Sequence, residues 1–443
     1  MSAEDDDRLA RVALTWLVEP GHRTVWELVQ QQGAAATLAE ILAGRFATPS
    51  LGNLVAARAG KGDPVRMAEL ALRHTRRLGA RVVVPGDQEW PGRVESLATL
   101  EFGRRDRVHR DVRPPLCIWV RGEHPLGAAL ERSVSVVGAR AATSYGLHVT
   151  MDIAFGLAEQ GWTVVSGGAM GIDATAHRAA LGAGGLTIAV LACGVDRPYP
   201  VSNTALFEQI AETGLLMSEW PPGSDPLRHR FLIRNRVIAA ATAGTVLVEA
   251  AARSGAVQTM GRVLALNRPA LVVPGPVTSA MSVGCHELLR TCPGTRVVTN
   301  AAQVLDEVGR IGEYYAEPAR ALSHARDELD EESALVLEAV PDHGTAGPEE
   351  LAARAGVRLR TVLQRLTLLE IKGLVVRRDN GFALTRAARA SVSRTAPLPS
   401  NAPSPPAAIP SPAALFSVPE LSVGTQKSPP DRKELPAAPE EQG

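Results

Sequence analysis

The sequence predicts an α/β protein whose central domain is a doubly wound, mostly parallel sheet. Short β-branched runs, apolar on both faces, alternate with helical patterns between residues 133 and 308. Strands of this kind, joined by helices, are typical of a parallel sheet covered on both sides, a Rossmann-like architecture. The predicted strands of this series are Ser133–Val137, Thr163–Ser166, Thr187–Leu191, Leu215–Ser218, Thr245–Val248, Ala270–Val273 and Arg296–Thr299, preceded by Val82–Val84 and Cys117–Val120.

The chain has 443 residues, which is enough for two or three domains. Basic and acidic residues balance at 47 each, so a generally polycationic protein is excluded and any nucleic-acid surface must be a local patch. Of the basic residues 43 are Arg and 4 are Lys, so cationic sites are built from planar guanidinium groups.

Two smaller domains are expected on either side of the central domain, which we place at residues 80–310. Residues 1–75 carry short helical patterns, the first over Arg8–Val18, and predict a small helical module. Residues 330–389 predict three helices and a hairpin with an Asn-Gly turn, the element order of a winged helix. Residues 390–443 contain 12 Pro, which predicts a disordered tail.

The sequence gives no sign of export, of a membrane span or of a disulfide framework. The four cysteines form no Cys-x-x-Cys pair, as expected of reduced thiols in a cytosolic protein. The acidic start of the chain lacks the basic region of a signal peptide, and no apolar stretch is long enough to span a bilayer. We therefore expect a cytoplasmic protein without a membrane partner.

Two loops that follow predicted strands could bind an anion. The first, Val137–Gly146, lacks the dinucleotide fingerprint but offers Arg140, two hydroxyls and a helix N-terminus. The second, Ser166–Asp173, contains Gly167, Gly168 and Gly171, whose backbone N–H groups could approach a ligand closely. Each loop also has a purely structural interpretation. The first could be a plain strand-to-helix turn, and the glycines of the second could serve only tight strand–helix packing. His177, one turn further on, is expected to be a structural partner.

A cluster of arginines is the third candidate feature. Four Arg fall within nine residues, and Phe231 lies among them. Arg230 and Arg234 are four residues apart and would share one face of a helix. Guanidinium groups for the backbone and a ring for base stacking are what a single-strand binder needs, whereas the alternative is a solvated helix face. The four arginines are Arg228, Arg230, Arg234 and Arg236.

The motifs of several enzyme classes are absent from the sequence. There is no Walker A motif, HExxH or GxSxG, and no acidic cluster that could hold catalytic Mg²⁺ in the loops. Glu219 and Glu249 each end a predicted strand without forming an evident acid/base couple. We expect no catalytic residue, no metal and no cofactor.

The sequence resembles the DNA-processing protein A family (DprA, also called Smf) over roughly residues 80–310. The resemblance rests on the ordered motifs GAR-x-x-x-x-YG, SGGAMGIDATAH, AVLACGVDRPYPVSN, SEWPPG, RF-x-x-RNR-x-I, VEAAARSGA and VPGPVTSAMSVGCHELLR. It implies sequence-independent binding of single-stranded DNA in a positive pocket and delivery of that DNA to the RecA recombinase, in natural transformation and recombination. It also implies a homodimer, no catalysis, a winged helix and an N-terminal module of the SAM or helix-hairpin-helix type.

The resemblance and the residue chemistry together give the expected DNA-binding set. It consists of Arg140, Ser166, Gly167, Gly168, Gly171, Arg230, Phe231, Arg234, Asn235 and Arg236. Two positions depart from the family pattern: Met170 stands where a basic residue is usual, and Ile233 replaces one Arg of a usual pair.

Two other functions stay open at the level of sequence. Residues 243–249, which end in Glu249, are faintly similar to the loop of lysine-decarboxylase-like phosphoribohydrolases, which would make the protein a nucleotide-processing enzyme. The winged helix could instead belong to a transcription regulator that binds duplex DNA. The segment from Arg354 to Arg389 contains nine basic residues and only two acidic ones, a bias that suits duplex binding.

Overall fold

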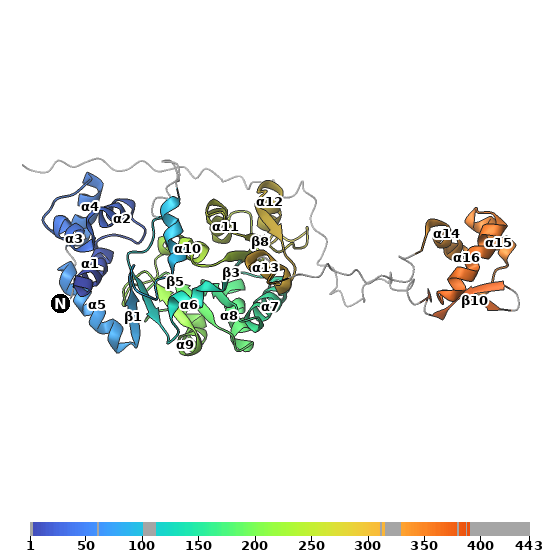
Figure 1. The fold of residues 1–443 in the computed structure, drawn as a ribbon, viewed down its shortest axis with the longest axis horizontal. Helices are drawn as coiled ribbons and strands as arrows, with labels where there is room; N and C mark the ends of the chain where they lie inside the picture. The colour runs from blue at the N-terminus through green and yellow to red at the C-terminus, as the bar shows by residue number, and fades with distance from the viewer. Residues whose placement is uncertain are drawn as a thin grey trace, which may run out of the picture. The chain divides into compact units, whose positions relative to one another are not determined.

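The computed structural model describes residues 3–59, 62–100, 112–310, 312–314, 329–378, 381–386 and 388–389. They belong to two compact units, Met1–Pro318 and Ala319–Gly443 (Figure 1). In these residues, no helix is long and apolar enough to cross a lipid bilayer. The predicted Pro-rich tail, residues 390–443, lies outside the described residues.

The first unit is built on a nine-stranded sheet of order β1-β2-β6-β5-β4-β3-β7-β8-β9. The seven strands from β6 to β9 in this order pair in parallel, whereas β2 pairs antiparallel with β6 and β1 antiparallel with β2. The strands are β1 (Ala80–Val83), β2 (Ile118–Arg121), β3 (Ser133–Val137), β4 (Thr163–Ser166), β5 (Thr187–Leu191), β6 (Leu215–Ser218), β7 (Gly244–Leu247), β8 (Ala270–Val272) and β9 (Thr295–Val297). The doubly wound, mostly parallel α/β prediction is confirmed.

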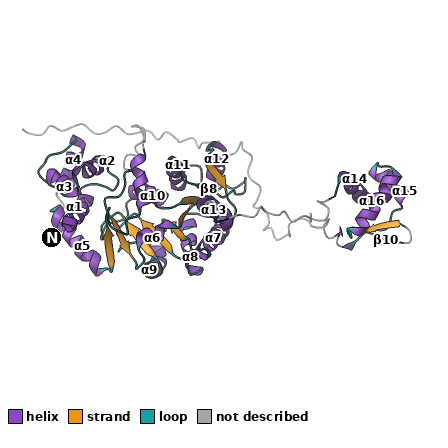
Figure 2. Cartoon of the chain, in the orientation of Figure 1, coloured by secondary structure: helices purple, strands orange, loops and turns teal. Residues whose placement is uncertain are grey.

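Helices cover both faces of this sheet (Figure 2). They are α6 (Leu126–Glu131), α7 (Ser144–Glu159), α8 (Ile172–Gly182), α9 (Thr204–Thr213), α10 (Arg228–Ala241), α11 (Gly255–Ala265), α12 (Val283–Thr291) and α13 (Ala301–Val308), with 3-10 turns η1 (Gly92–Thr99) and η3 (Val201–Asn203). Val164 packs in one apolar cluster with α7 and α8, and its neighbour Val165 packs in another with α10 and α11. Side chains alternate between the faces of a strand, so both faces of β4 are buried and its sequence is continuously apolar.

The strand order reverses at β3. The chain runs from β3 outward to β6, crosses back through α10, and continues as β7, β8 and β9 on the other side of β3. The loops after β3 and β7 therefore leave the sheet in opposite directions, which opens a crevice at the carboxyl ends of these strands.

The N-terminal module has five helices, all within the first unit: α1 (Ala3–Leu17), α2 (Arg23–Gln32), α3 (Ala34–Leu42), α4 (Pro49–Ala59) and α5 (Pro64–Arg77). Helical patterns over Arg8–Val18, Thr24–Gln31 and Thr37–Ala43 predict the first three of these helices, whereas α4 and α5 were not predicted. The signal for α5 was present, because the Asp63 side chain caps the helix and Pro64 occupies its first turn. Leu14 and Trp119 belong to one apolar cluster, which joins the module to the sheet.

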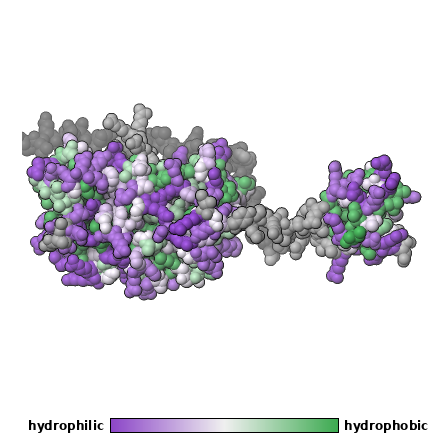
Figure 3. Space-filling model, viewed as in Figure 1, coloured by the Kyte–Doolittle hydropathy of each residue, from purple (hydrophilic) through white to green (hydrophobic). Residues whose placement is uncertain are grey.

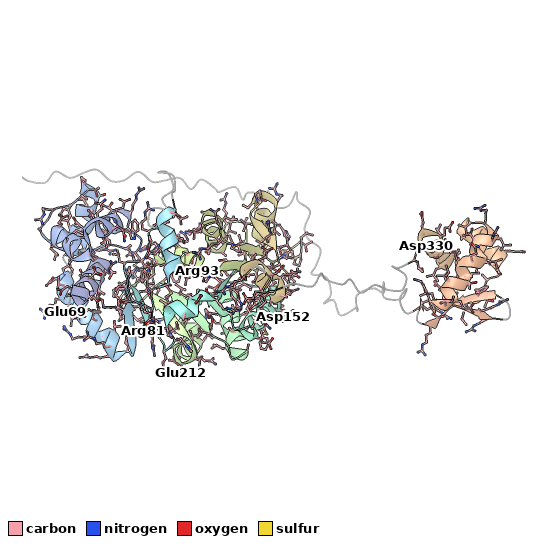
Figure 4. All side chains as sticks on the ribbon, in the orientation of Figure 1. Glu69, Arg81, Arg93, Asp152, Glu212 and Asp330 are labelled. Atoms are coloured by element: carbon pink, nitrogen blue, oxygen red, sulfur yellow. The ribbon has the colours of Figure 1, made fainter. Side chains whose placement is uncertain are left out.

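The second unit contains α14 (Glu331–Ala339), α15 (Pro348–Ala355), α16 (Leu359–Ile371) and an antiparallel pair, β10 (Val375–Arg378) and β11 (Gly381–Leu384). Asp330 caps α14 by accepting a hydrogen bond from the Ser333 backbone (2.8 Å), and Figure 4 labels it beside that helix. Val336, Leu351 and Leu366 form the core of the unit with the hairpin. The order of three helices and a hairpin is the predicted one; the Asp379-Asn380 part of the turn lies outside the described residues.

Candidate nucleic-acid interface

A cleft of about 820 Å³ opens at the point where the strand order reverses. Its walls come from the loop after β3, from the start of α8, from the first turns of α10 and from the start of α11. The lining residues that carry charge or an aromatic ring are Arg140, Asp173, Tyr199, Arg228, Phe231 and Arg234. Ligands of doubly wound sheets bind in a crevice at this location, so the cleft is the candidate site.

Phe231 is the centre of an aromatic and cationic cluster in this cleft. The guanidinium carbon of Arg140 lies 5.6 Å from the Phe231 ring centroid, and that of Arg234 lies 6.0 Å from it. The Tyr199 ring meets Phe231 edge-on, with 5.9 Å between the centroids. Arg140 is exposed and Phe231 is half-buried. Cations over a ring are held by its quadrupole, so the cleft presents a positive charge beside an aromatic surface.

Arg234 forms part of the floor of the cleft. Its side chain is buried, and Nη1 donates to the backbone carbonyls of Gly167 (2.9 Å) and Val190, while Nε donates to Asn235 Oδ1 (3.1 Å). Burial lowers the pKa of Arg234 to about 10, so the guanidinium is still charged at neutral pH. These hydrogen bonds join the ends of β4 and β5 to α10. The guanidinium charge makes the potential of the floor positive.

The three glycines of the second loop lie beneath the cleft, whereas Ala169 of the same loop lines it. A Cβ on Gly167 would lie within 2.7 Å of the Arg234 guanidinium, and a Cβ on Gly171 within 2.5 Å of the Ala139 and Arg140 carbonyl oxygens. Gly168, at φ +72°, leaves no room beside Phe207. Close packing therefore accounts for these glycines. Ser166 is likewise buried and donates to the Val136 carbonyl (2.7 Å).

Arg230 and Arg236 point away from the cleft. Arg230 and Arg234 lie one turn apart on α10 as expected, but their guanidinium groups meet different partners, since that of Arg230 pairs with Glu19 (3.1 Å) and covers the Trp220 ring. Arg236 is fully buried and pairs with Glu219 at 2.5 Å. The second half of α10 enters the core, so its arginine cannot reach a phosphate in this structure.

Three charged or aromatic residues that line the cleft were absent from the predicted set. Arg228 is exposed at the start of α10, and Tyr199 is 46% exposed beside Phe231. Asp173 is buried at the start of α8, and burial raises the pKa of its carboxyl against the opposing effect of Arg234. Arg228 could have been predicted, because it belongs to the arginine cluster of the sequence. Tyr199 and Asp173 come from separate segments that only the fold brings together. Met170, where a basic residue was expected, is 53% exposed.

Glu249 supports the first loop. Its carboxylate is buried and accepts hydrogen bonds from the Thr143 backbone N–H (2.9 Å) and hydroxyl (2.6 Å). The Thr143 hydroxyl in turn accepts from the Gly146 N–H and caps α7. Both oxygens of Glu249 are thus engaged in holding the loop that carries Arg140. Among the described residues, no group of three or more His, Cys, Asp or Glu could hold a metal ion.

His177 is a structural residue, as expected. Its side chain is fully buried, and Nδ1 lies 2.7 Å from the Thr187 hydroxyl at the start of β5. Burial lowers the pKa of His177 to about 3, so the imidazole is neutral at physiological pH.

Comparisons with known proteins find relatives of this chain in sequence and in fold. The family model described as DNA recombination-mediator protein A matches residues 81–309. A DNA processing protein DprA from Mycobacterium tuberculosis is 44% identical over 345 residues, covering 78% of this chain and 87% of that protein. The X-ray structure of DprA from Streptococcus pneumoniae aligns with a TM-score of 0.54 at 26% identity, covering 70% of this chain and 99% of that chain.

A structure of DNA processing protein A from Helicobacter pylori is described by its single-stranded DNA binding mode. It covers 49% of this chain and 95% of that chain, at 27% identity and a TM-score of 0.41. The region matched by the family model contains the parallel strands β3 to β9 and every residue that lines the cleft. The chain therefore belongs to the DNA recombination-mediator protein A family, also known as DprA or Smf.

Proposed function

We propose that the cleft binds single-stranded DNA without sequence preference. The observation that carries this proposal is the cluster of Arg140, Phe231 and Tyr199 in a cleft where the strand order reverses. Phosphates pair with the exposed guanidinium groups of Arg140 and Arg228, and bases stack on the Phe231 ring. Stacking is tolerant of sequence because every base has a π-face. Single-stranded DNA is also the ligand described for the H. pylori member of the family.

The remaining residues of the predicted set have supporting roles in this proposal. Arg234 and Asn235 form part of the floor, and Arg234 supplies a positive charge there. Ser166, Gly167, Gly168 and Gly171 pack beneath the floor. Arg230 and Arg236 anchor α10 to neighbouring carboxylates and contact no phosphate.

The cellular role follows from family membership. We propose that the protein mediates recombination in the cytoplasm by delivering the bound strand to the RecA recombinase during DNA uptake, that it does so as a homodimer, and that it is not an enzyme. The family is one of recombination mediators, which supports this role. The nucleotide-hydrolysis alternative would need a free Glu249 carboxylate, and both of its oxygens are bonded to Thr143.

We propose that the C-terminal unit is a winged helix that docks a protein. In a winged helix the exposed face of the third helix enters the DNA groove. Here the exposed face of α16 carries Leu359, Leu363, Leu368 and Ile371, the last of them 77% exposed. Figure 3 shows hydrophobic side chains on the surface of this unit. Such a face is better suited to an apolar protein partner than to phosphates.

A fluorescence anisotropy titration tests the proposed ligand. A labelled dT oligomer and a matched duplex are titrated at two salt concentrations with the wild type and with Arg140→Ala. Arg290→Ala, on the exposed surface of α12, is the control (the Arg290 side chain is 73% exposed). We expect salt-sensitive preference for the single strand that Arg140→Ala weakens and Arg290→Ala leaves unchanged. Duplex binding of equal or greater strength, unaffected by Arg140→Ala, would contradict the proposal.

A further inference from the structure

A carboxylate of the N-terminal module contacts α10, the helix whose first turns form one wall of the nucleic-acid cleft. Glu19 lies in the turn between α1 and α2, and its side chain is 16% exposed. Oε1 accepts from Arg58 of α4 (2.7 Å) and from Arg230 of α10 (3.1 Å), and Oε2 accepts from the Trp220 indole (2.8 Å). One side chain thus joins a helix of the module, the segment after β6 and the first turn of α10.

The first turn of α10 lacks the usual stabilising features of a helix start. Leu227 at its N-cap makes no side-chain hydrogen bond to the helix, and no acidic residue lies in the first turn. That turn carries Arg228, His229 and Arg230 at the positive end of the helix dipole, where cations are unfavourable. Glu19 lies 3.1 Å from Arg230 and 3.7 Å from His229 and so supplies the missing negative charge.

The other groups around Arg230 do not replace this carboxylate. The Asp225 carboxylate pairs with Arg197 (2.8 Å), and only its backbone carbonyl accepts from Arg230 (3.0 Å). The Trp220 ring lies under the guanidinium at 5.5 Å and is itself bonded to Glu19. Glu19 therefore pairs with Arg230 directly and also bonds the Trp220 ring that lies under it.

The residue after Arg230 is Phe231, the aromatic centre of the cleft. Because the two residues are adjacent in one helical turn, fixing Arg230 on the module side fixes Phe231 on the cleft side. We propose that Glu19 is a positioning residue for single-stranded DNA binding, which acts through Arg230 on the first turn of α10 and hence on Phe231. This inference rests on the proposed function of the cleft, and it assigns the N-terminal module a role in that site.

The test compares Glu19→Ala with two other variants in the full chain. Glu19→Gln keeps the shape of the side chain without its charge. It replaces the alanine variant in the test if that variant folds poorly. Glu69→Ala is the matched control, because Glu69 is an exposed member of an ion pair on α5 of the same module (Figure 4). Hydrogen exchange without DNA is expected to accelerate at residues 228–232 in both Glu19 variants and to stay unchanged in Glu69→Ala.

Binding of a labelled dT oligomer is then measured in the wild-type and Phe231→Ala backgrounds. We expect Glu19→Ala to weaken binding roughly three- to tenfold in the wild-type background and to have little effect once Phe231 is absent, because coupled residues are not additive. The salt dependence should stay unchanged, since Arg230 contacts no phosphate. A merely structural role of Glu19 would weaken binding equally in both backgrounds.

Three results would overturn the inference. Tighter binding by Glu19→Ala, with a salt slope steeper by about 0.7, would show that Glu19 masks Arg230 as a phosphate ligand. Equal weakening in both backgrounds, or unchanged exchange in α10, would show that Glu19 does not position Phe231. If the wild type fails to bind dT while exchange in α10 still responds to Glu19, the proposed function fails and the positioning of α10 by Glu19 stands.

Discussion

Arg140 and Phe231 should contribute to DNA binding in different ways. Arg140 is exposed and is the phosphate ligand in the proposed binding mode, whereas Phe231 offers a ring. Arg140→Ala should weaken binding to all sequences and flatten the dependence of log K on log salt by about 0.7, the value for one phosphate contact to a single strand. Phe231→Ala should weaken binding by about 1–3 kcal/mol per stacked base with an unchanged salt slope. Titrations of dT and mixed-sequence oligomers over a salt series distinguish the two residues. A flatter salt slope in Phe231→Ala and an unchanged slope in Arg140→Ala would reverse the assigned roles.

A substitution of Gly171 tests how closely the two loops pack beneath the cleft. At φ +79° a side chain is strained, and a Cβ would also overlap the Ala139 and Arg140 carbonyl oxygens. Gly161 has nearly the same φ, +71°, with open space around it. Gly161→Ala should therefore cost only the left-handed strain of about 1–2 kcal/mol, and Gly171→Ala clearly more. Urea denaturation measures the free energy of unfolding of both variants. Equal decreases in this free energy would mean that the loops move apart without an energetic cost.

The buried pair of Glu219 and Arg236 should matter for stability. Both side chains are almost completely buried, at 1% and 0% exposure, with 2.5 Å between the charged atoms. Glu219→Gln would leave the Arg236 charge uncompensated and should lower the free energy of unfolding by about 3–5 kcal/mol. Glu287→Gln removes an exposed partner of Arg290 and should change it by less than about 1 kcal/mol. Urea denaturation of the two variants checks this difference, and a small effect of Glu219→Gln would mean that water reaches the pair.

At the scale of elements, the contact between α8 and β5 should make stability depend on pH. Burial lowers the pKa of His177 from 6.5 to about 3, so the folded protein keeps this imidazole neutral while the unfolded chain protonates it below pH 6.5. The His177 contribution is complete above pH 6.5 and is lost as pH falls toward 3, at about 1.4 kcal/mol per pH unit. His177→Gln should flatten the curve of unfolding free energy between pH 6.5 and 4. An unchanged slope in this variant would assign the dependence to other groups.

The strands and the helices with strong patterns could be predicted at this scale from sequence. β3, β4, β5 and β6 have the predicted limits, because their runs are bounded by turn residues or charges. The helix α4 was missed, since its apolar residues do not follow a clear helical period and its stability comes from packing against α1. Local patterns predict an element only where burial is reflected in that element's own residues.

At the scale of the whole molecule, the two units should act separately in DNA binding. Each has its own apolar core, and all residues that line the cleft lie in the first unit. A chain of residues 1–318 should therefore bind a dT oligomer with the affinity and salt slope of the full protein, within about twofold. Anisotropy titrations of the two chains side by side test this, with circular dichroism to confirm folding. A loss of affinity greater than tenfold would place part of the site in residues 319–443.

The sequence alone determined the parallel α/β architecture, the crevice loops and the segment that carries the arginines, because strand burial and loop composition are local properties of the chain. Only the tertiary structure decided what each arginine does. Arg230, Arg234 and Arg236 belong to one helix, yet they meet Glu19, the Gly167 carbonyl and Glu219 respectively. These partners lie 211, 67 and 17 residues away in the chain. A long, flexible guanidinium takes its direction from the nearest carboxylate or carbonyl in space, which no local pattern specifies.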